Sequence, residues 1–412
     1  MMLENTFKNA PQLKKTAYLY AAIILNTLLG FAATKLNTHY LTMDDFGRLN
    51  FFIITLTFAQ NFLSFGVFES VSRRIAIESS IQKIRELNGV TVLFSVASGI
   101  LFIVIIYAWS FFSDRFFEVS IGGLLRDYAP LTFVFIWQTM LLILLRGRGD
   151  IPALSVFTFS PRLLYAAGLS YIALAFVFTL KSTLLLFLIS ILLVTAVFIF
   201  RLRPVFSAIE DNLKIVWKET LSFGRHLYIA NLISGVIMHA DKFFLAYFLD
   251  ARQLGLYTLA FTLSVPLLHF STAVSRSHYH EFANSPVMAS SVLKTNLFVQ
   301  ISGVTALIVS GKAIILYIFS ADYLPGLQAL YILAVAFGFS GLSMPFTSFL
   351  KAHGKGREIR NITIQVQLIL IVLNVLLIPL WGINGAAAAV LAANGYDLLA
   401  YYLKYKRVEK IT

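Results

Sequence analysis

The sequence predicts an all-α integral membrane protein of about 12 transmembrane helices, and its composition and hydropathy pattern carry this prediction. Of the 412 residues, 58% are apolar and 13% are charged, about half the ~25% charged content of a soluble domain. The mean hydropathy is +0.79. Apolar residues form continuous runs, such as 90–112, and not the alternating segments of an outer-membrane barrel. Since a spanning helix needs about 20 apolar residues, the chain has room for about 12 spans, and a water-soluble enzyme is excluded.

The apolar runs place each span in turn. The predicted spans are 17–40, 49–71, 88–112, 127–145, 153–178, 183–202, 226–248, 256–276, 295–320, 328–350, 360–380 and 383–403. Most connections are short. The longest, 201–225, predicts a cytoplasmic amphipathic linker. We therefore expect two lobes, residues 1–205 and 206–412.

Charge patterning predicts the orientation of these spans. Lys and Arg exceed Asp and Glu, for a net charge of +13. Most Lys and Arg lie in the segments that share one side of the membrane with both chain ends, which predicts an even number of spans and cytoplasmic termini. The basic balance thus indicates cytoplasmic loops beside anionic membrane lipids and not a nucleic-acid partner. The chain has no cysteine, so disulfides and cysteine metal sites are excluded.

The two halves repeat weakly. "YLTMDDFGRLNFF" (40–52) aligns with "FLDARQLGLYTLA" (248–260), which places Gly47 on Gly255. "LLRGRG" (144–149) lies at a similar offset from "FLKAHG" (349–354). Such repeats predict two six-helix lobes of the same orientation around a central cavity, as transporter folds use.

Several segments carry a resemblance to a known family. "LTMDDFGRLNFF" (41–52), "LSFGVFESVSRRIA" (63–76), "DKFFLAYFLDARQLGLYTLAFTLSVPL" (241–267) and "KAHGKGREIRNI" (351–362) resemble Wzx-type O-antigen and polysaccharide lipid flippases. These belong to the multidrug/oligosaccharidyl-lipid/polysaccharide (MOP) export superfamily, which includes the MATE transporters. The resemblance covers essentially the whole chain.

The resemblance implies a two-lobed, alternating-access transporter in the bacterial cytoplasmic (inner) membrane. It implies flipping of undecaprenyl-pyrophosphate-linked oligosaccharide repeat units for O-antigen of lipopolysaccharide, capsule or exopolysaccharide. A cationic lumen would match the pyrophosphate. The implied partners are the lipid-linked oligosaccharide, membrane lipids, a polysaccharide polymerase and a chain-length regulator, with H⁺ or Na⁺ as coupling ion.

Span seven holds the strongest candidate site residues. Its polar residues fall on one helical arc, which predicts that the arc lines a wet cavity; they are Asn231, Ser234, Gly235, Met238, His239, Asp241 and Lys242. In this interpretation Lys242 attracts the substrate phosphate, and Asp241 partners it or carries a proton. We then expect Lys242→Ala to reduce flipping at unchanged protein abundance. The alternative is that Asp241 and Lys242 pair with neighbours near the outer surface.

Three further cations are candidate lumen residues because charge within a span usually faces a cavity or a partner. Lys35 either lines the lumen or extends to the outer interface. Arg162 either holds a phosphate or caps a carbonyl freed by Pro161. Lys312 is a lumen candidate that also lies close enough to the outer end of its span to extend there.

Two carboxylates are candidates for ion coupling or gating, in addition to Asp241. Glu69 lies one turn before Arg73, which predicts a local ion pair; the alternative is a cytoplasmic gate. Asp397 shares a face with Asn394 and Tyr401, which fits either a proton or sodium site or an interhelical hydrogen bond.

Two other functions compete with the flippase. A cation-coupled multidrug antiporter of the same superfamily would favour carboxylates over Lys and Arg in its site. A membrane glycosyltransferase or polysaccharide polymerase would need a larger outer loop than any predicted here. GxxxxGK[ST], HExxH and GxSxG are absent from the sequence, so we expect no enzyme activity of those types, no metal and no cofactor.

Overall fold

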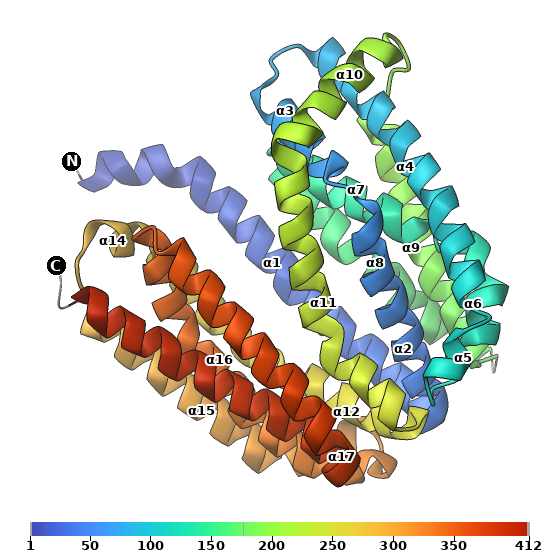
Figure 1. Cartoon of the computed structure of the whole chain (residues 1–412), viewed down its shortest axis with the longest axis vertical. Coiled ribbons are helices and arrows are strands. Elements are labelled where there is room, and N and C mark those ends of the chain that lie inside the picture. Colours follow the sequence, from blue (N-terminus) through green and yellow to red (C-terminus); the bar gives the residue numbers. More distant parts are fainter. Residues whose placement is uncertain (1, 176, 410–412) are drawn as a thin grey trace. The chain divides into compact units, whose positions relative to one another are not determined.

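The computed structural model describes residues 2–175 and 177–409, which form helices and short connections without strands (Figure 1). The chain divides into two compact units. Unit 1 contains residues 2–41, 51–116 and 120–239, and unit 2 contains residues 42–50, 117–119 and 240–409. The helices α2 and α11 therefore each pass from one unit to the other.

Unit 1 is built mainly from the first half of the chain. Its helices are α1 (Met2–Tyr40), most of α2 (Met43–Gln60), η1 (Asn61–Leu63), α3 (Val67–Ile77), α4 (Ile81–Trp109), α5 (Ser113–Phe116), α6 (Gly122–Tyr128), η2 (Ala129–Leu131), α7 (Val134–Gly147), α8 (Ile151–Leu174), α9 (Leu180–Leu202), α10 (Ile209–Glu219), η3 (Thr220–Gly224) and the first part of α11 (Arg225–Phe248). Helix α8 packs against both α1 and α9, and α7 packs against α3, α4 and α9.

Unit 2 contains the remaining helices. They are the last part of α11, α12 (Ala251–Ser264), α13 (Leu267–Ser277), α14 (Tyr279–Asn284), α15 (Ser290–Ile314), η4 (Ile315–Phe319), η5 (Ala321–Gly326), α16 (Leu327–Ala352) and α17 (Gly356–Glu409). Helix α16 is central, since it packs against α12, α13, α15 and α17. The most apolar stretch of Ala321–Ala352, which contains η5 and α16, is 61% buried, whereas that of Ser290–Phe319, which contains α15 and η4, is 11% buried.

Each predicted span overlaps one helix, two consecutive helices or one segment of α17. Among the described residues, 6 helices are by themselves long and apolar enough to cross a membrane, or up to 8 if each bent pair is one span. One of these helices, α17, has 54 residues and breaks at Gly382, where φ is 55° and ψ is −134°. The break separates the two spans predicted at 360–380 and 383–403.

Two predicted spans are bent and not straight. The span predicted at 49–71 is a pair of segments that bend by 66° where Phe65 and Gly66 adopt positive φ values of 46° and 73°. The span predicted at 127–145 bends by 55° between Leu131 and Val134. Hydropathy locates apolar residues but does not respond to backbone conformation, so the prediction missed both bends; only the bend at Phe65 and Gly66 involves left-handed residues.

The glycines aligned by the internal repeat meet in unit 2. A Cβ at Gly255 would lie 3.3 Å from the backbone nitrogen of Gly47, and a Cβ at Gly47 would overlap the carbonyl oxygen of Ala251. The first turns of α2 and α12 therefore cross with their backbones in contact, which only residues without a side chain allow. The repeat thus places equivalent glycines at one helix crossing.

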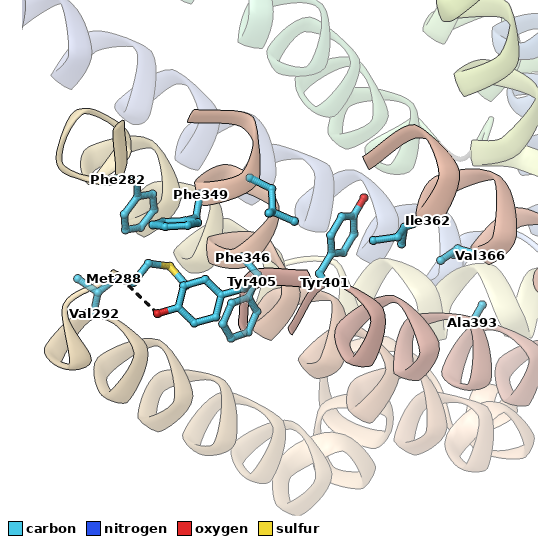
Figure 2. Close-up of a cluster of buried hydrophobic side chains, with 11 residues drawn as sticks. Phe282, Met288, Val292, Phe346, Phe349, Ile362, Val366, Ala393, Tyr401 and Tyr405 are labelled. Atoms are coloured by element: carbon cyan, nitrogen blue, oxygen red, sulfur yellow. Dashed lines mark hydrogen bonds between the residues drawn. The ribbon is translucent and has the colours of Figure 1, made fainter. Parts of the chain in front are cut away.

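Aromatic side chains close one end of unit 2. Figure 2 shows Phe282, Phe346, Phe349 and Tyr405 gathered from α14, α16 and α17. The ring centroids of Phe349 and Tyr405 are 5.1 Å apart in an edge-to-face arrangement. The Tyr405 hydroxyl accepts a hydrogen bond from the backbone nitrogen of Met288 at 3.4 Å. The connection that precedes α15 is therefore fixed to the last helix of the chain.

Candidate functional site

Unit 1 contains a pocket of about 320 Å³ between α1, α2, α7, α8 and α9. Its walls combine apolar side chains with one cation and several hydroxyl and amide groups. The lining residues are Asn26, Ile53, Thr57, Phe135, Gln138, Leu142, Phe157, Thr158, Pro161, Arg162, Tyr165, Phe187 and Ile191. Within the part of the chain that the structure describes, Arg162 is the one charged residue of this lining.

Arg162 is held against α1. It follows Pro161 on α8, and its Nη1 donates a hydrogen bond to the backbone carbonyl of Asn26 at 3.0 Å. Gly30 provides the space for this contact, because a Cβ there would lie 2.9 Å from Nη1. The guanidinium therefore does not cap the carbonyl that Pro161 frees in its own helix. Arg162 nevertheless remains accessible, so a ligand can reach it.

The pocket suits an anionic, hydroxyl-rich ligand. A guanidinium has five N–H donors, and the hydrogen bond to the Asn26 carbonyl uses one of them, on Nη1. Thr57, Gln138 and Thr158 add polar groups around it, while the described lining contains no Asp or Glu. A cation at the centre of a membrane span costs about 2.5–3.5 kcal/mol by insertion scales. An anion bound at Arg162 would offset this cost.

Asp241 and Lys242 form a buried ion pair in unit 2. Lys242 Nζ lies 3.1 Å from both carboxylate oxygens of Asp241, and the two residues are 6% and 5% exposed. The Tyr257 hydroxyl donates to Asp241 Oδ2 at 2.9 Å. The Lys242 ammonium also lies 3.7 Å from the centroid of the Phe261 ring. The predicted partnership of these two residues is thus present, and both are packed against side chains of α12.

The polar arc of span seven is divided between the units. Asn231 belongs to unit 1 and is exposed, whereas Asp241 and Lys242 are buried in unit 2. The prediction that the arc lines a wet cavity stays a prediction. Ser234, Gly235 and Met238 lie in the segment 233–238, which is outside the residues whose side-chain surroundings the structure describes. His239, the last residue of unit 1, is half-buried.

The predicted local ion pair of Glu69 and Arg73 is wrong. Arg73 Nη1 instead contacts Glu219 Oε1 at 2.6 Å, and its guanidinium lies 4.6 Å from the Phe223 ring centroid. Glu69 Oε1 accepts a hydrogen bond from Asn231 Nδ2 at 2.9 Å. The cause is tertiary: α10 and η3 pack beside α3 and offer Arg73 a carboxylate that lies far away in sequence.

Asp397 makes an interhelical hydrogen bond, which is one of the two interpretations that the sequence left open for this residue. Its Oδ2 accepts from the Ser343 hydroxyl of α16 at 2.6 Å, and Asn394 on the same face donates to the backbone carbonyl of Ala336 at 2.9 Å. Lys35 and Lys312 are both exposed, in unit 1 and unit 2 respectively. Arg162 belongs to unit 1, whereas Lys242 and Asp397 belong to unit 2, where each has a different hydrogen-bond partner.

Comparisons with known proteins show the family and the fold of the chain. The family model described as "Polysaccharide biosynthesis protein" matches residues 12–279. The chain belongs to this polysaccharide biosynthesis protein family. The comparison with curated proteins returns no sequence match.

Solved structures of MOP transporters share the fold of this polysaccharide biosynthesis protein. The lipid II flippase MurJ in an inward closed conformation is similar at a TM-score of 0.70 and 16% identity, over 94% of this chain and 87% of that chain. An inward-facing MATE-family multidrug resistance transporter gives 0.73 and 15%, over 94% and 96%. The outward-facing conformation of a MATE-family transporter gives 0.61 and 16%, over 97% and 96%. The predicted fold class, an all-α membrane protein of about 12 helices, is confirmed.

Sequence reasoning missed several residues that shape the sites of this family member. The backbone of Asn26 and the small size of Gly30 hold Arg162, yet both lie more than a hundred positions before it in the sequence. Tyr257 and Phe261 complete the surroundings of Asp241 and Lys242. A helical wheel of span seven cannot show them because they come from the next helix.

Proposed function

We propose that this chain flips undecaprenyl-pyrophosphate-linked oligosaccharide repeat units across the bacterial cytoplasmic membrane by alternating access. The Arg162 pocket is the observation that carries the proposal. It offers a cation, hydroxyls and amides with no carboxylate in the described lining, which matches a phosphate joined to sugar hydroxyls. The polysaccharide biosynthesis family supports the same substrate class. In this proposal both termini are cytoplasmic, and residues 1–205 and 206–412 form the two lobes.

Arg162 binds the pyrophosphate in this mechanism. One nitrogen stays on the α1 carbonyl of Asn26, which fixes the orientation of the guanidinium, and the remaining donors meet phosphate oxygens in the planar geometry that arginine provides. At about 320 Å³, the pocket holds the phosphate end or a single sugar and not a whole repeat unit. The rest of the substrate must therefore lie outside the pocket.

The other predicted residues keep supporting roles in the proposal. Lys35 and Lys312, both exposed, attract the anionic headgroup, and Asn231 offers it an amide. Coupling to H⁺ or Na⁺ uses Asp241, Asp397 or Glu69, each of which already accepts a hydrogen bond. A polysaccharide polymerase and a chain-length regulator act on the flipped product.

A deletion strain tests the proposed function. We expect loss of surface polysaccharide and accumulation of the lipid-linked repeat unit on the cytoplasmic face, both restored by the wild-type gene. Normal surface glycan without accumulation, in a strain with no other flippase, would overturn the proposal. Resistance to cationic dyes on overexpression would then favour the multidrug antiporter.

Variants at the pocket test the residue assignment. We expect Arg162→Gln to lower complementation at least about tenfold at matched abundance, because a charge-assisted hydrogen bond contributes about 1.5–3 kcal/mol. Gly30→Ala should give a partial loss, since the added methyl group displaces the guanidinium. Arg115→Gln is the matched control, because Arg115 is an exposed cation of unit 1 outside the pocket. Equal complementation by all three variants would remove Arg162 from the substrate site.

A further inference from the structure

Unit 2 contains a second pocket, of about 470 Å³, where α16 begins and the two segments of α17 meet. Its lining residues are Gln328, Ile332, Trp381, Asn384 and Ala388. It lies at the end of α16 opposite the aromatic cluster of Figure 2, because Gln328 and Phe349 stand near opposite ends of this helix. The pocket is therefore separate from the Arg162 pocket, which belongs to unit 1.

The break in α17 creates this pocket. Gly382 has φ 55° and ψ −134°, a combination that is essentially restricted to glycine. It ends the first segment at Trp381 and starts the second just before Asn384. The Trp381 side chain is left 61% exposed, while Ile332 and Ala388 supply the apolar part of the lining.

The amides of this pocket have unused hydrogen-bonding groups. Asn384 Nδ2 donates to Gln328 Oε1 at 3.1 Å, which leaves the amide nitrogen of Gln328 available. No partner of that nitrogen or of the Trp381 indole nitrogen is found within residues 2–175 and 177–409. Gln253 adds a third amide nearby, since a Cβ at Gly382 would lie 3.1 Å from its Oε1.

These groups favour one class of ligand. The lining residues that the structure describes include no charged residue, so they offer an ion no counter-charge. Gln328 is exposed and Asn384 is half-buried, and a lipid tail would offer these amides no hydrogen-bond partner. A sugar ring satisfies both parts of the pocket, because its C–H face packs on an indole and its hydroxyls reach amide donors and acceptors. The volume also lies within the roughly 300–1,000 Å³ of small-ligand sites.

We propose that the Trp381 pocket binds a single neutral sugar ring, which stacks on the indole and is held by the amides of Gln328 and Asn384. The inference rests on the proposed function only for the source of the sugar. With both termini cytoplasmic, the break at Gly382 faces the outer side of the membrane. The sugar then belongs to the repeat unit delivered to the outer leaflet; a free sugar outside the cell is the other source.

Tryptophan fluorescence tests the pocket without any transport. The chain has 4 tryptophans; replacing Trp109, Trp137 and Trp217 by Phe leaves Trp381 alone. In nanodiscs, we expect a saturable emission change on titration with glucose, galactose or N-acetylglucosamine. Asn384→Leu should weaken binding about tenfold, which corresponds to about 1.4 kcal/mol. Tighter binding of the repeat oligosaccharide released from its lipid would identify the transported substrate as the source, and equal binding would identify a free sugar.

A matched protein that keeps only Trp217 is the control. Trp217 is 59% exposed on α10 and lies outside the pocket, so its emission should not change. Absence of a saturable change at Trp381, or the same change at Trp217, would overturn the sugar site. If the triple variant fails to fold, saturation-transfer NMR compares sugar binding by the wild-type protein with binding by Trp381→Leu. Equal signals from the two proteins would likewise overturn the sugar site. Failure of this binding leaves the deletion-strain result unaffected, so the two proposals fail separately.

Discussion

The Asp241–Lys242 pair gives the sharpest prediction about the interior of unit 2. The charged atoms are 3.1 Å apart, and the Lys242 and Asp241 side chains are only 7% and 6% exposed. Removing one partner of such a pair leaves a buried charge without compensation, which costs about 3–5 kcal/mol. We therefore expect Lys242→Met to lower the ratio of folded to unfolded protein by about two to four orders of magnitude. This changes the expectation from sequence that Lys242→Ala leaves abundance intact.

The double variant separates pairing from packing. Replacing a buried ion pair by neutral groups of similar volume is often close to neutral. We therefore expect Lys242→Met combined with Asp241→Asn to be more stable than Lys242→Met alone. The Tyr257 hydroxyl can still donate to the new amide oxygen at position 241. The free energy of unfolding is measured for each variant by reversible unfolding in mixed micelles of detergent and lipid.

An exposed pair with a similar distance between its charged atoms is the control. Lys181 Nζ lies 3.0 Å from Asp127 Oδ2, but these side chains are 69% and 51% exposed. Surface pairs contribute about 0–1 kcal/mol, so Lys181→Met should cost less than about 1 kcal/mol. The reasoning is refuted if Lys242→Met and Lys181→Met have equal effects, because burial would then not determine the cost.

Other substitutions test single contacts, each by the same unfolding measurement. Gly47→Ala should lower the free energy of unfolding by more than 2 kcal/mol, about the effect of overpacking a tight core. Gly123→Ala should be neutral or stabilising by up to about 1 kcal/mol, because a Cβ at position 123 meets nothing within 4 Å. Equal costs of the two variants would contradict the close crossing of α2 and α12. Gly382→Ala should cost about 1–3 kcal/mol from its backbone conformation, and a neutral result would mean that α17 continues through the break. Ser343→Ala removes the donor to Asp397 and should cost about 1–3 kcal/mol. Asp397→Asn keeps an acceptor and should cost less. A larger cost for Asp397→Asn than for Ser343→Ala would show that the carboxylate is not held by this bond.

Hydropathy by itself determined where the helices lie. A membrane span must satisfy its backbone hydrogen bonds internally, so each apolar run of sufficient length predicts a helix, and α9 and α16 follow their predicted ranges closely. The repeat was also readable from local sequence, since Gly47 and Gly255 stand out as glycines in matching contexts. The bend at Gly66 was not predicted, because left-handed backbone conformations leave no hydropathy signal.

Only the tertiary structure decided the partners of the charged side chains. Sequence neighbours placed Arg73 beside Glu69, but a guanidinium on a long side chain pairs with whichever carboxylate packing brings near, and that is Glu219. Arg162 likewise meets a backbone carbonyl of α1. Sequence determined that these charges lie in or beside apolar helices, where desolvation makes a partner necessary. The choice among possible partners depends on helix packing, because the competing groups lie on helices far apart in the chain.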